Sequence, residues 1–128
     1  MTRTALLIED NEQNRYLATF LLERHGYRVV AAADGRAALS AIQGFTPDVI
    51  LLDIQLPGMD GYEVARLLRE LDSLRAIPII AVTSYAMLGD REKSLAAGCN
   101  GYIEKPIDPD TFIREIQQVL VATAEAPR

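Results

Sequence analysis

The chain has 128 residues, of which 49% are hydrophobic, and this fits one domain with a core of its own. Its 18 acidic and 13 basic residues give a formal net charge of −5, which argues against direct binding to nucleic acid or to an acidic membrane surface. No apolar run approaches the roughly 18 residues of a membrane span, and the N-terminus lacks the apolar core of a signal peptide. Cys99 is the single cysteine and cannot form an internal disulfide, so we expect a cytoplasmic protein.

Short apolar segments alternate with helical patterns along the chain. Three of these segments are almost unbroken, which is typical of strands that are buried on both faces of a parallel sheet. The predicted strands are, in chain order, Ala5–Ile8, Arg28–Ala32, Val49–Leu52, Ile79–Thr83 and Tyr102–Glu104.

The first predicted helix extends from about Glu12 to His25 and ends at Gly26, a residue suited to the left-handed position after a helix. The second helix begins after Asp34 and stops at Gly44. The side chains of the first helix that we expect to pack into the core are Tyr16, Leu17, Phe20 and Leu21.

Capping residues mark the later helices. Asp60 can cap the third helix, with Glu63 three residues later as in a capping box. The fourth helix is expected from about Leu88 to Ala97.

The last helix has the strongest start signal. Asp108 is expected as its cap and Pro109 as its first residue. We expect a domain of residues 1–122, followed by a frayed tail of residues 123–128. The apolar stripe of this helix consists of Phe112, Ile113, Ile116, Val119 and Leu120.

Five repeats of strand followed by helix indicate an α/β fold with parallel strands, right-handed crossovers and helices on both faces of the sheet. The predicted topology is flavodoxin-like, a doubly wound (βα)5 sheet with strand order 2-1-3-4-5. In this order the first and third strands are neighbours at the switch point, where open α/β sheets bind their ligands.

Acidic side chains follow the first and third strands directly. Glu9 and Asp10 come after one strand and Asp53 after the other, so we expect the three carboxylates to share one cleft. Their mutual repulsion must be relieved by protonation or by a bound cation. Hard oxygen ligands with open positions for water suit Mg²⁺, and the sequence has no Cys/His cluster that would favour zinc.

Two further side chains are expected at the same edge of the sheet. Lys105 follows the last strand and precedes Pro106, and it supplies a mobile positive charge that can balance an anion. Thr83 ends the fourth strand and supplies a hydroxyl donor. A carboxylate beside a divalent ion can act as nucleophile towards a phosphoryl group, so phosphoryl chemistry is expected here.

With these residues the chain resembles the receiver domains of bacterial two-component response regulators, which belong to the CheY-like superfamily. The resemblance covers nearly the whole chain, and each matching segment falls at the end of a predicted strand. The segments that carry it are Ala5–Asp10, Asp53–Gly61, Val82–Ser84 and Lys105–Pro106.

The resemblance implies a role for each of these residues. Asp53 would accept a phosphoryl group from a histidine kinase or a histidine phosphotransfer protein. Thr83 and Lys105 match the switch hydroxyl and the phosphate-binding lysine, and Tyr102 matches an aromatic residue that turns inward on activation. The family has a cis peptide before the residue that matches Pro106, which the sequence alone does not establish. The groups that would hold Mg²⁺ are the side chains of Glu9, Asp10 and Asp53 and the backbone carbonyl of Gln55.

Residues 83–92 are similar to two groups in the family, the stand-alone receivers of the DivK type and the receiver modules of hybrid histidine kinases. Because the chain stops soon after the last predicted helix, we expect a stand-alone receiver that has no DNA-binding domain and acts through protein contacts. It would be a phosphorylated switch rather than a turnover enzyme. A downstream regulatory protein would bind the face from about Ser84 to Ile116.

Three alternatives remain open. A receiver module of a hybrid kinase would share the same chemistry. A Mg²⁺-dependent phosphatase with an Asp nucleophile usually has a second acid two residues on, whereas this chain has Gln55 there. A nucleotide-binding or structural flavodoxin-like module is the third, but neither a G-x-G-x-x-G motif nor a P-loop follows the first strand.

Overall fold

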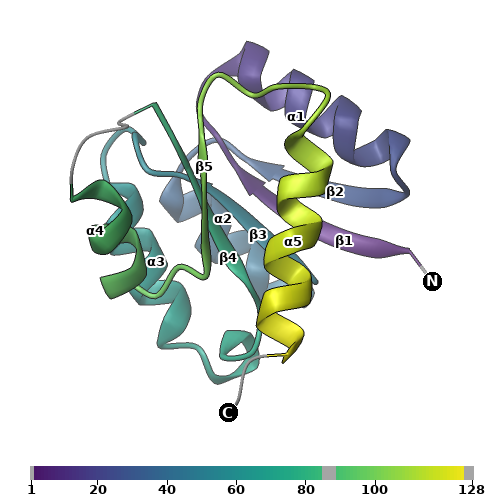
Figure 1. The fold of residues 1–128 in the computed structure, drawn as a ribbon. Coiled ribbons are helices and arrows are strands. Elements are labelled where there is room, and N and C mark those ends of the chain that lie inside the picture. Colours follow the sequence, from purple (N-terminus) through teal and green to yellow (C-terminus); the bar gives the residue numbers. More distant parts are fainter. Residues whose placement is uncertain (1, 85–88, 126–128) are drawn as a thin grey trace.

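The computed structural model describes residues 2–84 and 89–125 (Figure 1). One five-stranded parallel sheet has the order β2-β1-β3-β4-β5, which confirms the predicted topology. Its strands are β1 (Arg3–Ile8), β2 (Tyr27–Ala32), β3 (Val49–Asp53), β4 (Ile79–Thr83) and β5 (Gly101–Glu104).

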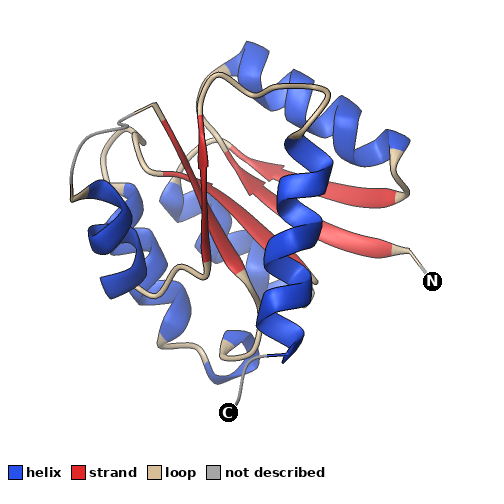
Figure 2. Ribbon diagram, in the orientation of Figure 1, coloured by secondary structure: helices blue, strands red, loops and turns tan. Residues whose placement is uncertain are grey.

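The helices lie between successive strands and after the last strand, and Figure 2 shows them on both sides of the sheet. Two short 3₁₀ helices, η1 (Ile42–Gly44) and η2 (Asp72–Leu74), complete the connections. The α-helices are α1 (Glu12–Arg24), α2 (Gly35–Ala41), α3 (Gly61–Arg69), α4 (Asp90–Ala96) and α5 (Phe112–Glu125).

The core has two layers because successive side chains of a strand point to opposite faces of the sheet. In β1, Ala5 and Leu7 pack with residues of α1 and α5, whereas Leu6 and Ile8 pack on the other face with residues of α2 and α3. All residues of β3 and β4 are buried, as expected for strands covered on both faces. Both strands are therefore packed on both faces of the sheet up to their last residues, Asp53 and Thr83.

Side-chain caps fix the starts of three helices. Asn11 Oδ1 accepts a hydrogen bond from the Asn14 N–H at 2.9 Å at the start of α1. Asp34 accepts from the Ala37 N–H at 2.8 Å at the start of α2, and the predicted cap Asp60 accepts from the Glu63 N–H at 3.0 Å at the start of α3. Each cap satisfies a donor that has no partner within the helix.

The prediction that Tyr16 and Phe20 belong to the core is wrong, because their side chains are 74% and 45% exposed. The buried residues of α1 are Ala18, Leu21 and Leu22, and Leu17 is half-buried. At 100° per residue, Tyr16 and Phe20 fall on the side of the helix opposite to Ala18. The guanidinium of Arg24 instead covers the Phe20 ring, at 5.6 Å from its centroid.

The start of α5 also differs from the prediction. The helix begins at Phe112 rather than at Pro109. The Asp108 side chain accepts from the Asp110 N–H at 2.9 Å, and its carbonyl accepts from the Thr111 and Phe112 N–H groups, so residues 109–111 form a turn. The expected stripe is present, with Phe112, Ile113 and Ile116 buried and Val119 and Leu120 packed beside them. The expected start of α4 at Leu88 lies outside the described residues.

Candidate functional site

The three predicted carboxylates lie at the carboxyl ends of β1 and β3. One ligand oxygen from each of Glu9, Asp10 and Asp53 lies within 4.8 Å of the others. Glu9 and Asp53 are each 3% exposed, whereas Asp10 is exposed to solvent. The Asp10 side chain is not needed to cap α1, because Asn11 is the cap. The backbone here is held by the Arg15 guanidinium, which donates to the carbonyls of Glu9 and Asp10 at 2.9 and 3.4 Å.

Lys105 joins two of these acids. Its Nζ lies 2.8 Å from Glu9 Oε1 and 3.1 Å from Asp53 Oδ2. Its backbone N–H donates to the Thr83 carbonyl at 2.8 Å, and the Lys105–Pro106 peptide bond is cis. Burial works against the charged form of this lysine, but the hydrogen bond to Glu9 and the charge of Asp53 leave its pKa raised. Lys105 is therefore a fully charged ammonium at neutral pH.

Glu9 is the most strongly perturbed acid of the site. Burial, followed by its hydrogen bond with Asp53, raises the pKa of Glu9 to about 7. The ammonium of Lys105 and the Asn11 N–H, at 3.2 Å from Oε2, oppose this rise. When Glu9 and Asp53 are both ionised, they carry more negative charge than the one ammonium balances, and this excess favours the binding of a further cation.

The loop after β3 holds Asp53 from the other side. The Gln55 N–H donates to Asp53 Oδ1 at 2.9 Å, and the Gln55 side chain reaches Ser84 at the end of β4. Gly61, the first residue of α3, packs directly on this loop. A Cβ atom on Gly61 would lie 2.4 Å from Ile54 Cα and 2.7 Å from the Asp53 carbonyl oxygen, so a glycine is required here.

Two residues expected to respond to phosphorylation lie in the neighbouring strands β4 and β5. Thr83 ends β4 and is 1% exposed. Tyr102 is half-buried in β5 and packs against the core layer that α2 and α3 cover. The roles of both residues remain predictions, since the structure shows their positions but no second state.

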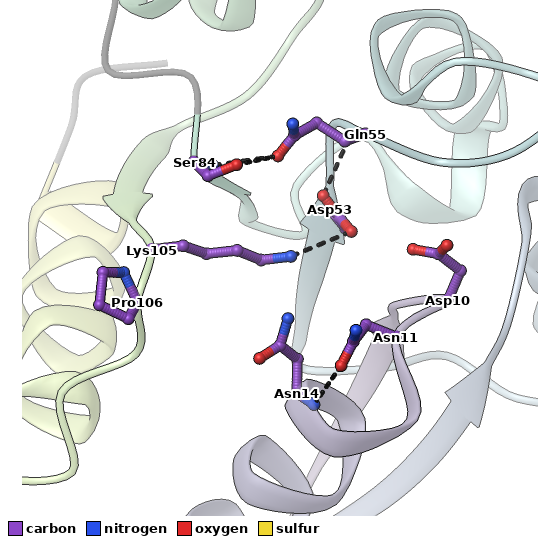
Figure 3. A pocket seen from close by; sticks show the side chains of 8 residues that line it. All are labelled: Asp10, Asn11, Asn14, Asp53, Gln55, Ser84, Lys105 and Pro106. Carbon is purple, nitrogen blue, oxygen red and sulfur yellow. Dashed lines mark hydrogen bonds and ion pairs between the residues drawn. The ribbon is translucent and has the colours of Figure 1, made fainter.

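A pocket of about 470 Å³ opens onto this cluster (Figure 3). Sequence reasoning missed the contributions of Asn11, Asn14 and Ser84 to its wall. The signals were weak: the asparagines lie in the first turn after the acidic pair, and Ser84 directly follows Thr83. The residues that line the pocket are Asp10, Asn11, Asn14, Asp53, Gln55, Ser84, Lys105 and Pro106.

The donor set of this pocket fits a hard divalent cation. The clustered ligands are all carboxylate oxygens, and the exposure of Asp10 leaves one side of the cluster open to water. Mg²⁺ prefers a site of this kind, with one or two carboxylates and several retained waters. The position of the Gln55 carbonyl as a fourth ligand remains a prediction.

The fold and the site define a doubly wound α/β domain that gathers an acidic cluster and a lysine at the carboxyl edge of its sheet. The sequence profile of the response regulator receiver domain matches residues 5–117, and the chain belongs to this family. Response regulators of this family are signalling switches and generally not turnover enzymes, and receiver domains interact with histidine kinases and downstream effectors in two-component systems. The alternatives of a receiver module of a hybrid histidine kinase and of a Mg²⁺-dependent phosphatase are not favoured.

Known proteins resemble the chain over nearly its whole length. The polar-differentiation response regulator DivK of Brucella ovis is 43% identical over 120 residues, which cover 94% of this chain and 98% of that protein. The structure of the chemotaxis response regulator CheY4 of Vibrio cholerae has a TM-score of 0.89 at 30% identity and covers 93% of this chain and 99% of that one.

A third relative is a receiver domain whose structure contains a metal ion. The receiver domain of a sensor histidine kinase from Pseudomonas aeruginosa PAO1 has a TM-score of 0.85 at 38% identity, covering 94% of this chain and 99% of that one. Its structure holds a magnesium ion coordinated in the active site cleft.

Within the described part of our chain, none of the helices has the length and apolar character needed to cross a membrane.

Proposed function

We propose that the protein is a phosphoaccepting response regulator in which Asp53 receives the phosphoryl group. One observation carries this assignment. Of the two carboxylates that contact Lys105, Asp53 lines the open pocket, whereas Glu9 is not among the described residues that line it. A phosphoryl donor that enters the pocket therefore meets Asp53, with the positive charge of Lys105 beside it.

Each residue of the site has its own role in the proposed phosphoryl transfer. A carboxylate oxygen of Asp53 attacks the phosphorus of a phosphohistidine, the P–N bond breaks, and its electron pair stays on the imidazole nitrogen, which takes up a proton. Lys105 balances the charge of the incoming group. Glu9, Asp10 and Asp53, with the Gln55 carbonyl, would hold Mg²⁺. The bound ion would neutralise charge on the phosphoryl oxygens.

The product is an aspartyl phosphate whose new charge and acceptor oxygens can draw Thr83 and Lys105 inward. Closing Thr83 leaves space for Tyr102 to turn further into the protein. If the two states differ by a few kcal/mol, this gain in contacts is enough to shift the population. We propose that a downstream regulatory protein reads the face from Ser84 to Ile116, of which residues 85–88 lie outside the described part.

The donor would be a histidine kinase or a histidine phosphotransfer protein of the cytoplasm. The receiver would act as a single domain, residues 1–122, through protein contacts. Support for this reading comes from the relative DivK, of which the chain covers 98%.

Mass spectrometry after incubation with acetyl phosphate and Mg²⁺ tests the assignment. We expect one added phosphoryl group, which is absent in Asp53→Asn and strongly reduced when a chelator removes the metal. Asp72→Asn is a matched control, because Asp72 is an exposed aspartate that pairs with Arg75 away from the pocket. Full phosphorylation of Asp53→Asn would contradict the proposal.

A further inference from the structure

Gln55 contacts two parts of the site through different atoms. Its backbone N–H donates to Asp53 Oδ1 at 2.9 Å. Its side-chain Oε1 accepts two hydrogen bonds from Ser84, one from the backbone N–H at 3.1 Å and one from the hydroxyl at 2.5 Å. Figure 3 shows this side chain crossing from the loop after Asp53 to the end of β4. The residue that holds the Asp53 carboxylate therefore also holds the residue that follows Thr83.

This side-chain bridge takes the place of a main-chain hydrogen bond. The ladder between β3 and β4 continues to Ile54, whose N–H donates to the Val82 carbonyl at 3.2 Å. In a parallel ladder the next bond would join the Ser84 N–H to the Ile54 carbonyl. That carbonyl instead accepts from the Gly61 N–H at 3.0 Å. Gln55 Oε1 supplies the replacement acceptor, so the last link between the two strands is made by a side chain.

We propose that the Gln55 side chain is a positioning residue, which holds the end of β4 beside Asp53 before the phosphoryl group arrives. The inference rests on the proposed function, in which the Thr83 hydroxyl meets a phosphoryl oxygen. Ser84 is exposed and lines the pocket, so without the bridge its N–H and hydroxyl would turn to water. Holding this end of the strand in advance removes an ordering cost from the step in which Thr83 closes.

The test compares binding of the phosphoryl analogue beryllofluoride, in the presence of Mg²⁺, by NMR titration of backbone amides. Gln55→Met keeps the backbone N–H, the carbonyl and the side-chain length but removes the acceptor. Losing two hydrogen bonds between neutral groups near the surface should weaken beryllofluoride binding about 3- to 10-fold. Gln43→Met makes the same change at an exposed glutamine of η1 outside the pocket and should leave the affinity unchanged.

Two further measurements separate positioning from a general disturbance of the site. Affinity for Mg²⁺ alone should stay within about twofold in Gln55→Met, because the carboxylates and the backbone of residue 55 are retained. Ser84→Ala removes the hydroxyl donor and keeps the N–H, so it should give a smaller loss of beryllofluoride affinity. The double variant should be no weaker than Gln55→Met alone, since both changes remove the same bridge.

Several results would overturn the inference. Equal beryllofluoride affinity in Gln55→Met and the unaltered protein would do so while leaving the proposed function intact. Equal losses of Mg²⁺ and beryllofluoride affinity would do so as well, because Gln55 would then act on the whole metal site. Failure of the unaltered protein to bind beryllofluoride would overturn the proposed function itself, and the inference with it.

Discussion

The ammonium of Lys105 lies 2.8 Å from a carboxylate oxygen of Glu9, and this pair is almost completely buried at the carboxyl edge of the sheet. The same ammonium contacts Asp53, so one positive charge serves two acids. A divalent cation that binds this cluster must compete with that charge for the same oxygens. The affinity of the site for metal is thus set by the lysine as well as by the acids.

Replacing Lys105 with Met should therefore strengthen Mg²⁺ binding and slow phosphorylation of Asp53. Without metal, Glu9 and Asp53 lose their shared counter-charge, and the free energy of unfolding should fall by about 3 kcal/mol. Saturating Mg²⁺ should restore part of this loss. Urea denaturation without Mg²⁺ measures the loss of stability, and urea denaturation with Mg²⁺ measures its recovery. An unchanged Mg²⁺ affinity in Lys105→Met would contradict the competition between Lys105 and the metal ion.

The raised pKa of Glu9 predicts opposite pH trends for stability and for metal binding. Burial and the hydrogen bond with Asp53 raise this pKa from 4.5 to about 7, so folding favours the protonated acid. Its contribution to stability is complete below pH 4.5 and is lost as the pH rises through about 7. Mg²⁺ requires the carboxylate, so its affinity should rise over the same range.

Urea denaturation of the metal-free protein and Mg²⁺ titration, both repeated between about pH 5 and 8, measure these trends. Glu9→Gln is the control, because it keeps the shape of the side chain but cannot titrate. Its stability and metal affinity should vary less with pH over this range. Identical pH profiles for Glu9→Gln and the unaltered protein would assign the trends to another group.

Asp10 should be the acid whose loss affects function most and stability least. Its carboxylate is exposed, and among the described residues it makes no hydrogen bond or ion pair. Asp10→Ala should weaken Mg²⁺ binding and remove most metal-dependent phosphorylation, while the unfolding free energy stays the same or rises slightly through relief of repulsion. Asp110→Ala, at an exposed aspartate before α5, should change neither property. Retention of full Mg²⁺ affinity in Asp10→Ala would remove this residue from the site.

Gly61→Ala should destabilise the protein, because the added methyl group would overlap the backbone of Asp53 and Ile54. We expect a loss of about 1–3 kcal/mol in the free energy of unfolding. Gly44→Ala is the matched control, since a Cβ atom there meets nothing within 4 Å. Urea denaturation measures both variants. Equal stabilities would show that the start of α3 can move away from the loop.

The sequence predicted the sheet order and the edge at which the acids meet, because unbroken apolar segments mark buried strands and each acid follows one directly. It failed for Tyr16 and Phe20, since apolar character alone does not identify the buried side of a helix such as α1. The prediction also placed the start of α5 at Pro109, because an Asp before a Pro is typical of a helix start. The same Asp108 is equally suited to close a turn, and the structure has a turn there. The bridge from Gln55 to Ser84 could not be predicted from the sequence. It depends on the hydrogen bond from the Gly61 N–H to the Ile54 carbonyl, which only the folded structure shows.

The hydrogen bond from the Gly61 N–H to the Ile54 carbonyl affects how the sequences of related proteins can change. Main-chain hydrogen bonds survive nearly every substitution, so the other hydrogen bonds between β3 and β4 do not depend on which side chain is present. At the link between Gln55 and Ser84, however, one codon change can strengthen, weaken or remove the connection between two strands. Related proteins could thus acquire different signalling lifetimes or thresholds while the fold and the acidic cluster remain the same.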